Sequence, residues 1–283
     1  MKKLFAIVLS AALLLGTAVA VTGCGNEDIV VYTEAGFAPF EYLSNGEIVG
    51  VDVDIMNQVG EKLGRNVVFE NVNFDVIVDT VSAGRLTNVG AAGLSITDER
   101  KEKVDFSVPY YEAALYVIYK TDEAPEISTT TDDVQGIYWE ALAGMDIGVQ
   151  GGTTADLFLS DELAEGGTIA GTNAQKVTFT SLSVAVQDIG LNTDVVIIDE
   201  LPAKTLVANN VGVSCLPLYY QGGDGEDDEA AVDQYAICVT KGQDELLDAI
   251  NEVLNDLLNQ KDEDGNNGIE QLVIKHLDLA TED

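Results

Sequence analysis

The chain has 283 residues, and its 49 aspartates and glutamates outnumber its 14 lysines and arginines, which gives a formal net charge of −35. So acidic a chain argues against a protein that binds nucleic acid or an anionic membrane surface, because both classes need basic patches. Hydrophobic residues make up 46% of the chain, so it can bury an ordinary globular core. The single histidine, His276, excludes a histidine-based triad and a cluster of histidine metal ligands. We expect neither a metal ion nor a cofactor.

Residues 1–23 predict a lipoprotein signal peptide. Lysines at positions 2 and 3 precede an uncharged apolar run that extends to Val21, and Val-Thr-Gly-Cys follows at positions 21–24. This order resembles a bacterial lipobox, in which cleavage precedes Cys24 and its thiol then carries a diacylglyceryl group. An ordinary signal peptide and an N-terminal anchor helix are the alternatives. The lipobox predicts an extracytoplasmic protein that its lipid anchors to the cell membrane.

Short β-branched runs alternate with helical patterns along the rest of the chain. The strand candidates are Ile29–Tyr32, Val67–Glu70, Val89–Leu94, Ala114–Tyr119, Asp146–Gln150, Val177–Thr180, Asp194–Ile198, Val213–Leu218 and Tyr235–Val239. Asp54–Leu63 and Glu245–Leu258 carry apolar residues at helical spacing. This alternation predicts an α/β fold with mainly parallel sheets.

Two polar segments interrupt this pattern. Thr121–Asp133 is acidic and rich in threonine, and Gln221–Asp233 is rich in glycine and acids, so both read as surface loops. They flank a middle segment with strands of its own, which predicts one lobe, an inserted second lobe and a return to the first. Two chain crossings would form a hinge beside a cleft. We expect residues 28–110 and 234–283 to form lobe I and residues 111–233 to form lobe II.

Two cysteines remain after the candidate lipid site. Cys215 and Cys238 each lie in an apolar, strand-like run, and the acidic loop between them can bring the two runs together. An exported protein can form a disulfide between them. Two buried thiols are the alternative.

The segment GLSITDERKEKVDFSVPYY, residues 93–111, contains one of only three arginines in the chain. Thr97 can cap a helical turn that contains Arg100. An arginine at such a strand-to-helix junction can bind a carboxylate through two parallel hydrogen bonds, at the strand edge where open α/β sheets bind ligands. The alternative is a surface ion pair with Asp98 or Glu102.

Two later segments also place polar groups at strand ends. GVQGGTTAD, residues 148–156, predicts a strand, a glycine turn and a helix N-terminus at Thr153 and Thr154, which suits a carboxylate. A plain threonine cap is the alternative. DVVIIDELPA, residues 194–203, predicts a buried strand that ends at Asp199, where a carboxylate can accept hydrogen bonds from an ammonium group. The alternative is an N-cap for the following helix.

These three segments, preceded in order by TEAGFAPFEY at residues 33–42 and GVDVDI at residues 50–55, resemble the family 3 extracellular solute-binding proteins. That family comprises the amino-acid receptors of ABC importers. The resemblance implies an α/β, two-lobed periplasmic-binding-protein type II fold with a ligand cleft between the lobes. It also implies a monomer that delivers a free amino acid to transporter permease subunits. Two stretches depart from the family pattern: residues 84–88, and the expanded, acid-rich turn at residues 262–268.

The resemblance also implies roles for individual residues. Those expected to bind the ligand carboxylate are Arg100, Thr153 and Thr154, with Gln150 nearby. Those expected at the ligand ammonium group are Gly93, Ser95 and Asp199. Those expected at the ligand side chain are Glu34, Phe37 and Phe74, although core packing is the alternative for Phe37. An acidic Glu34 favours a basic amino acid or glutamine, such as Lys, Arg or Gln, over an acidic one.

Two other function classes fit parts of this pattern. An enzyme on the same scaffold, such as a dehydratase-like relative, needs an acid or base in the cleft, for which Glu34 and Asp199 are candidates. The chain shows no nucleophile–base pair, however, and both acids already have a role in binding. A ligand-sensing lobe of a larger receptor is the other alternative. The sequence therefore favours a binding protein of an amino-acid importer over an enzyme.

Overall fold

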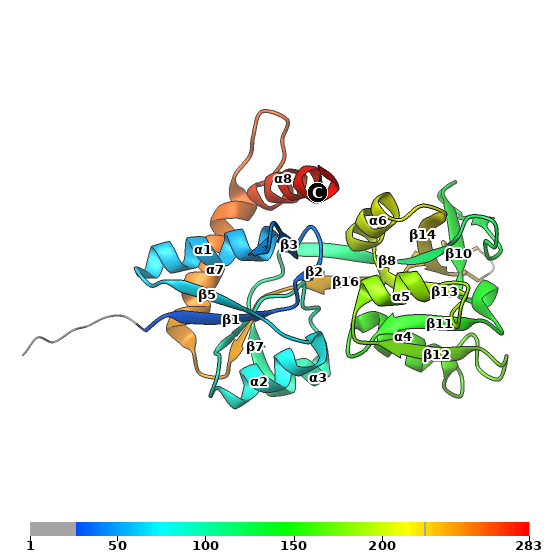
Figure 1. Cartoon of the computed structure of the whole chain (residues 1–283), viewed down its shortest axis with the longest axis horizontal. Helices are drawn as coiled ribbons and strands as arrows, with labels where there is room; N and C mark the ends of the chain where they lie inside the picture. Colours follow the sequence, from blue (N-terminus) through cyan, green and yellow to red (C-terminus); the bar gives the residue numbers. More distant parts are fainter. Residues whose placement is uncertain (1–26, 224, 283) are drawn as a thin grey trace, which may run out of the picture.

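The computed structural model describes residues 27–223 and 225–282. The candidate signal peptide and the candidate lipid site at Cys24 lie outside these residues. Within the described part, no helix is long and apolar enough to span a membrane. The described residues form two α/β lobes that lie side by side (Figure 1).

Lobe I is built on a five-stranded sheet of mixed direction, in which β1 pairs in parallel with β5 and β6, and β17 is antiparallel to β6 and β7. In spatial order its strands are β5 (Val67–Asn71), β1 (Ile29–Thr33), β6 (Val89–Gly90), β17 (Cys238–Thr240) and β7 (Val104–Phe106). A small antiparallel sheet contains β2 (Gly36–Phe37), β3 (Glu41–Ser44) and β4 (Glu47–Val49). The helices are α1 (Val51–Leu63), α2 (Ile77–Ala83), α3 (Asp98–Lys103), α7 (Asp244–Asn259) and α8 (Gly268–Glu282), with a 3₁₀ turn at Phe74–Val76.

Lobe II is built on a nine-stranded sheet. Its main path is β12 (Gln175–Phe179), β11 (Asp146–Gln150), β13 (Val195–Asp199), β8 (Tyr111–Lys120), β14 (Val213–Tyr220), β10 (Gln135–Tyr138) and β9 (Ser128–Thr129). Two short strands, β15 (Glu229–Ala230) and β16 (Val232–Tyr235), pair with β14 and β8. The helices are α4 (Thr154–Leu163), α5 (Leu182–Asp188) and α6 (Glu200–Asn209), with a 3₁₀ turn at Trp139–Leu142. The expectation of mainly parallel sheets is wrong at the centre of this lobe, because β8 is antiparallel to both β13 and β14.

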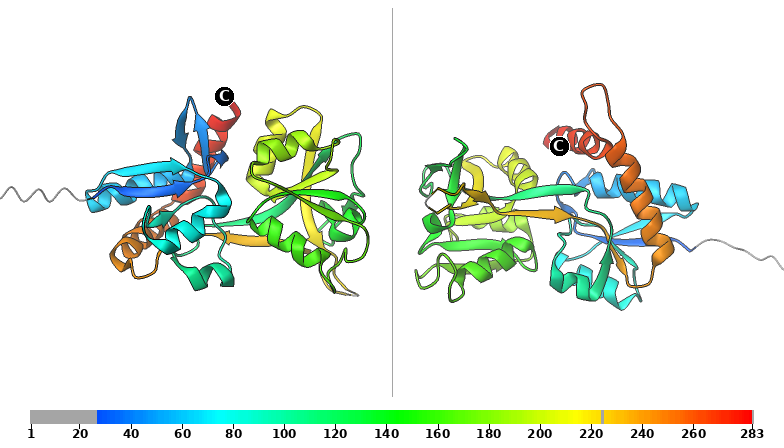
Figure 2. Two further views of the ribbon diagram at one scale, coloured as in Figure 1. Left: turned by 60° about the horizontal axis from the view of Figure 1, so that its bottom comes forward. Right: turned by 180° about the vertical axis from the view of Figure 1, so that it is seen from behind.

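The chain passes between the lobes through β8 and β16, which pair antiparallel and run side by side (Figure 2). The two loops expected to flank the second lobe are therefore not the crossings. Residues 121–133 lie within lobe II and contain β9, and residues 221–233 contain β15 and the start of β16. Two paired strands restrict the crossing more than two loose loops would. We keep residues 28–110 and 234–283 for lobe I, and 111–233 for lobe II, as proposed boundaries.

Hydrophobic periodicity explains the two long helices that the sequence predicts. In α7, buried residues recur at 246, 249, 250, 253, 254 and 257, so one face packs into the core of lobe I. The same face-forming spacing buries one side of α1, whose C-terminus is closed by Gly64 in the left-handed conformation. Both helices, predicted at Asp54–Leu63 and Glu245–Leu258, are confirmed.

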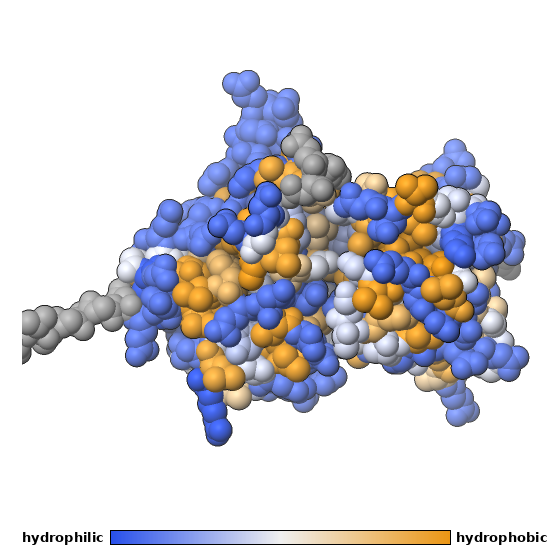
Figure 3. All heavy atoms as spheres, in the orientation of Figure 1, coloured by the Kyte–Doolittle hydropathy of each residue, from blue (hydrophilic) through white to orange (hydrophobic). Residues whose placement is uncertain are grey.

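The acidic stretch near the C-terminus forms the loop between α7 and α8, which projects from lobe I as a hydrophilic tip (Figure 3). Asp262 orders this loop, because its carboxylate accepts hydrogen bonds from the backbone N–H groups of Asp264 at 3.0 Å and Asn266 at 2.8 Å. Burial raises the pKa of Asp262, but these bonds and the one from the Asn266 side chain at 3.1 Å outweigh it and lower the pKa below its usual value. The insertion therefore changes the surface of lobe I and not its sheet.

The two cysteines are free thiols, so the disulfide alternative is wrong. Cys215 lies on β14 in the nine-stranded sheet, whereas Cys238 lies on β17 in the five-stranded sheet of the other lobe. Cys238 is fully buried, and burial raises its pKa to about 12, which leaves it an inert thiol. The alternative of two buried thiols holds for Cys238, whereas Cys215 is only partly buried.

Candidate functional site

Arg100 lies between the two lobes with only 7% of its surface exposed. Thr97 caps α3 by accepting a hydrogen bond from the Arg100 backbone at 3.1 Å, and this places the side chain at the lobe interface. The guanidinium donates to the carbonyl of Ser95 at 2.6 Å in lobe I and to the carbonyl of Gly152 at 2.8 Å in lobe II. Arg100 therefore contacts both lobes.

The surface ion pair considered for Arg100 does not form. Asp98 pairs instead with Lys101, at 3.3 Å. The guanidinium of Arg100 lies over the ring of Phe74, 5.6 Å from its centroid. The negative face of the aromatic ring stabilises the cation. Phe74 therefore meets the site at the arginine, while the sequence places it at the ligand side chain.

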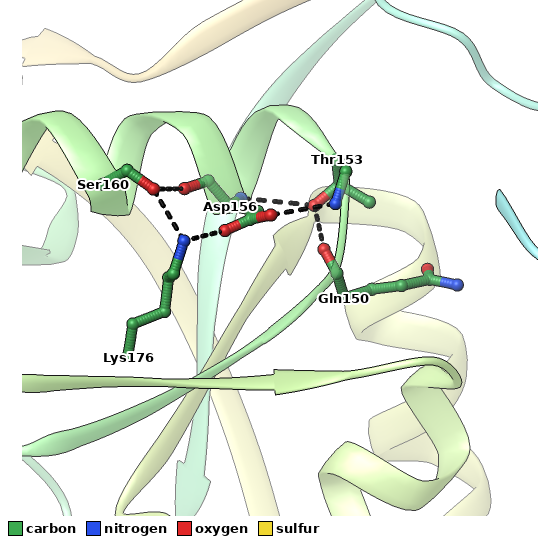
Figure 4. Close-up of polar contacts among 6 residues, drawn as sticks. Gln150, Thr153, Asp156, Ser160 and Lys176 are labelled. Carbon is green, nitrogen blue, oxygen red and sulfur yellow. Dashed lines mark hydrogen bonds and ion pairs between the residues drawn. The ribbon is translucent and has the colours of Figure 1, made fainter. Parts of the chain in front are cut away.

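The part of lobe II that contacts Arg100 is the turn between β11 and α4, which contains Gly152. Thr153 is the N-cap of α4, and its hydroxyl accepts from the Asp156 backbone at 3.3 Å and donates to the Gln150 carbonyl at 2.8 Å (Figure 4). Asp156 also pairs with Lys176, which donates to Ser160 at 2.7 Å. The plain-cap alternative thus holds for the Thr153 hydroxyl. The side chain of Thr154 is buried.

A hydroxyl pair joins the lobes beside Arg100. The Ser95 hydroxyl and the Thr154 hydroxyl are 3.3 Å apart, and both residues are buried. Gly93 precedes this pair with a positive φ of 51°, and its N–H donates to a carboxylate oxygen of Asp52 at 3.0 Å. The Gly93 backbone therefore has a conformation that other residues rarely adopt, and this conformation sets the direction of its carbonyl group.

Glu34 follows β1 and is partly buried. Burial raises the pKa of its carboxyl group, and the neighbouring Gln150 side chain opposes that rise. Gln150 is 2% exposed and comes from lobe II, so the pair brings the two lobes together. Phe37 is buried against Phe40 and Tyr235, with ring centroids 6.0 and 6.1 Å away. The core-packing alternative describes the ring of Phe37, which also contacts the Gly93 turn.

Asp199 ends β13 and is 6% exposed. Asp199 occupies the N-cap position of α6, as the alternative expected, but its side chain makes no capping hydrogen bond to the helix. Burial is the main cause that raises its pKa well above the usual range, and the nearby carboxylate of Asp233 raises it further. A group that stabilises its charge must therefore come from the ligand or from a neighbour such as Arg100.

Sequence reasoning missed the acids behind this site. Asp52 is 1% exposed and accepts from the Tyr110 hydroxyl at 2.5 Å as well as from Gly93. Burial raises its pKa to about 6. Glu41 is fully buried beside it, and burial together with the Asp52 charge raises the pKa of Glu41 well above its usual range. The acid inside the GVDVDI motif was the available signal, because a buried helix face seldom carries an unpaired carboxylate.

Replacing Asp52 by asparagine should reduce the pH dependence of stability. Because the folded pKa of Asp52, about 6, lies above its unfolded value, the charged form opposes folding above pH 6 and this cost falls as pH drops toward 4. Urea unfolding at pH 8 and pH 5 should show the wild type gaining about 1–2 kcal/mol more than Asp52→Asn on acidification. Equal gains in the two proteins would contradict the assignment.

Alanine at Gly93 should destabilise the protein more than alanine at another glycine of similar conformation. A Cβ at Gly93 would lie 2.7 Å from Cε1 of Phe37, whereas Gly46, with φ of 84°, has nothing within 4 Å of its Cβ position. Both changes incur backbone strain, but only Gly93→Ala adds overpacking, about 1–3 kcal/mol. Denaturant unfolding measures the difference, and equal losses for both variants would show that the Phe37 contact yields freely.

Several of the residues expected at the site, among them Ser95, Arg100 and Thr154, make contacts across the lobe interface, whereas Phe37 packs in the core of lobe I. A cationic group and several acidic groups lie there within reach of both lobes, which suits a small ligand that carries both charges. Among residues 27–223 and 225–282, no group of three histidine, cysteine or acidic side chains is arranged to hold a metal ion. The charged groups at this interface suit the recognition of a charged ligand.

The chain is similar to known proteins in sequence and in fold. The sequence pattern of the bacterial extracellular solute-binding proteins, family 3, matches residues 29–264. A Campylobacter jejuni protein named "Probable histidine-binding protein" is 30% identical over 69% of this chain and 68% of its own. The Escherichia coli ABC transporter arginine-binding protein 1 is 31% identical over 60% of this chain, and the match spans 63% of that relative's length.

Solved structures extend the comparison over nearly the whole fold. An amino acid ABC transporter substrate-binding protein, AbpA, from Streptococcus pneumoniae bound to L-arginine is 26% identical, with a TM-score of 0.71. The match covers 90% of this chain and 97% of that one. These comparisons confirm the predicted two-lobed periplasmic-binding-protein fold and the prediction of a binding protein instead of an enzyme. The chain belongs to family 3 of the bacterial extracellular solute-binding proteins.

Proposed function

We propose that the protein binds a free amino acid with a basic or amide side chain, such as Arg, Lys or Gln, and delivers it to the permease of an ABC importer. The observation that carries this proposal is that Arg100 and Asp199 are both buried and near enough for the charge of Arg100 to act on Asp199. A zwitterionic α-amino acid has one group for each. Relatives whose names specify arginine or histidine support the choice of a basic ligand.

The proposed roles follow from the contacts. Arg100 and the Thr154 end of α4 bind the α-carboxylate, because a guanidinium and a helix N-terminus both favour an anion. Thr153 contributes there through backbone position, since its hydroxyl caps the helix. Asp199, the Ser95 hydroxyl and the Gly93 carbonyl receive the α-ammonium group. Glu34 receives the cationic or amide end of the side chain, with Gln150 beside it.

The proposed mechanism is closure of the two lobes around the ligand. Arg100 and Glu34 belong to lobe I, while Thr154 and Asp199 belong to lobe II, so one bound amino acid contacts both. A ligand that contacts both lobes stabilises the closed arrangement over the open one. The paired strands β8 and β16 are the elements that would bend.

A thermal-shift screen over the proteinogenic amino acids tests the function. A ligand that binds only the folded protein stabilises it by mass action, and this raises the melting temperature. At a ligand concentration of 100 times Kd the free energy of unfolding increases by about 2.7 kcal/mol. We expect stabilisation by arginine, lysine, histidine or glutamine and none by glutamate or aspartate. No stabilisation by any amino acid would reject the function, and stabilisation by glutamate alone would reject the role of Glu34.

We also propose a lipid anchor at Cys24, which the lipobox-like sequence supports. Two acyl chains on one cysteine suffice for stable attachment. They would hold this acidic domain at a membrane surface that repels it. Fractionation of cells that express the full chain should recover the wild type with membranes and Cys24→Ser in the soluble extracytoplasmic fraction or unprocessed. Equal membrane recovery of both processed proteins would reject the anchor.

A further inference from the structure

Asp233 is an acidic residue beside the lobe interface that the sequence did not single out. It lies on β16, one of the two strands that connect the lobes. Both of its carboxylate oxygens are shielded from solvent and lack a hydrogen-bond partner of normal geometry, as do Oδ1 of Asp199 and the hydroxyl of Tyr235. Carboxylate oxygens buried without donors are costly, so this group of acceptors indicates a donor-rich ligand group between them.

Strand register places Asp233 and Asp199 on one face of the sheet. Asp199 lies opposite Leu115 on one side of β8, and Asp233 lies opposite Ala113 on the other side. Directly paired residues share a face, and so do residues two apart on one strand. The backbones that carry the two acids are therefore two strand spacings apart, on the order of 10 Å. On β8 between them, Ala113 and Leu115 share this face.

The same register identifies this face as the one at the lobe interface. Ser95 forms an isolated antiparallel bridge with Tyr235, which is two residues from Asp233 on β16. Ser95 faces Thr154 across the lobe interface at 3.3 Å. The two carboxylates thus flank the position where Ser95 and Thr154 meet.

At this position the buried acids outnumber the cations. Besides the two acids themselves, the charged groups that act on this pair are Arg100 from α3 and the buried Glu41 from β3. Arg100 already donates to two backbone carbonyls. Burial raises the pKa of Asp233, and Arg100, Ser95 and Thr154 oppose that rise only in part. Two neighbouring buried carboxylates ionise together only when a cation joins them.

We propose that Asp233 is a second carboxylate acceptor for the ligand's α-ammonium group, which it shares with Asp199 across β8. This inference rests on the proposed function. A primary ammonium group brings one positive charge and three N–H donors to a place where three carboxylate oxygens lack a hydrogen-bond partner of normal geometry. The acids thereby make a free, charged amino group a requirement for binding, and the link runs through a strand of the hinge.

Calorimetry with two probes on two proteins tests this role. The probes are L-arginine and 5-guanidinopentanoate, which keeps the carboxylate and guanidinium but lacks the amino group, measured by competition if its binding is weak. Asp233→Asn should weaken L-arginine binding by at least about tenfold, the effect of losing a hydrogen bond to a charged group. It should change binding of 5-guanidinopentanoate by less than about threefold. Asp199→Asn should give the same pattern.

Glu112→Gln is the matched control, because it removes the same charge from the same strand pair on the exposed, opposite face. It should leave both affinities unchanged. Equal weakening of both probes by Asp233→Asn would overturn the proposal, since Asp233 would then act through Arg100. Unchanged L-arginine binding would overturn it too. Asp233→Ala, checked for an unaltered melting temperature, replaces the first variant if that one misfolds.

Wild-type behaviour separates this inference from the function on which it rests. If L-arginine does not bind, the same comparison uses the amino acid that stabilises the wild type most and the matching acid without its amino group. A wild type that binds no amino acid rejects the proposed function and this inference together. A wild type that binds, with an Asp233→Asn variant that binds equally well, rejects only the role of Asp233.

Discussion

Arg100→Ala should bind its amino acid about 10²–10³ times more weakly than the wild type while it still folds. A buried guanidinium that pairs with a carboxylate through two hydrogen bonds contributes several kcal/mol, and its removal leaves the ligand carboxylate desolvated and unpaired. Lysine is not an adequate substitute, because its ammonium lacks the planar pair of donors. Arg100→Lys should therefore also lose most of the affinity. Calorimetric titration with the amino acid that stabilises the wild type measures both losses.

Arg65→Ala is the matched control for this experiment. The Arg65 guanidinium also donates to two backbone carbonyls, those of Glu27 at 2.7 Å and Asp28 at 3.4 Å, but in an exposed position away from the lobe interface. The Arg65→Ala variant should bind the amino acid with the affinity of the wild type. If Arg100→Ala binds as tightly as the wild type, Arg100 serves to join Ser95 to Gly152, and the carboxylate site lies elsewhere.

The sequence predicts most of the frame of this protein because its patterns are local. Helical spacing in α7 and the β-branched runs of β1, β11 and β13 depend on neighbouring residues in the chain. Arg100 was recognisable because a helix cap and a strand end adjoin it. Its neighbour Gly152 in lobe II was not, since that contact joins segments far apart in the chain.

The misses share one physical cause, which is pairing between distant strands. The crossings were expected in polar loops, but β16 pairs with β8 over more than a hundred residues of chain. The cysteines were adjacent candidates in sequence order, yet they belong to different sheets. Asp233 looked like the end of an acidic loop. Its burial depends on the register of β16, which no local pattern specifies.

Glu34→Gln should change ligand preference more than overall binding. The Glu34 carboxyl is partly buried at the lobe interface, and burial raises its pKa. A cationic ligand side chain that reaches Glu34 favours its charged form. An amide side chain needs only a hydrogen-bond acceptor, which glutamine at position 34 also provides. We therefore expect arginine and lysine affinity to fall by about 30-fold or more, as when one partner of a buried charge pair is lost. Glutamine affinity should change by less than about threefold.

The ratio of the two affinities makes this prediction independent of general damage. A distorted loop would weaken arginine and glutamine alike, because both use Arg100 and Asp199 at the backbone end. Glu47→Gln is the control, since Glu47 is an exposed acid on β4 of the small sheet that follows Glu34 in the chain, and its loss changes only net charge. At physiological ionic strength, charges are screened beyond about 8 Å, so this control should leave the ratio unchanged. A Glu34→Gln variant that keeps the wild-type preference for arginine would place the selectivity with other residues.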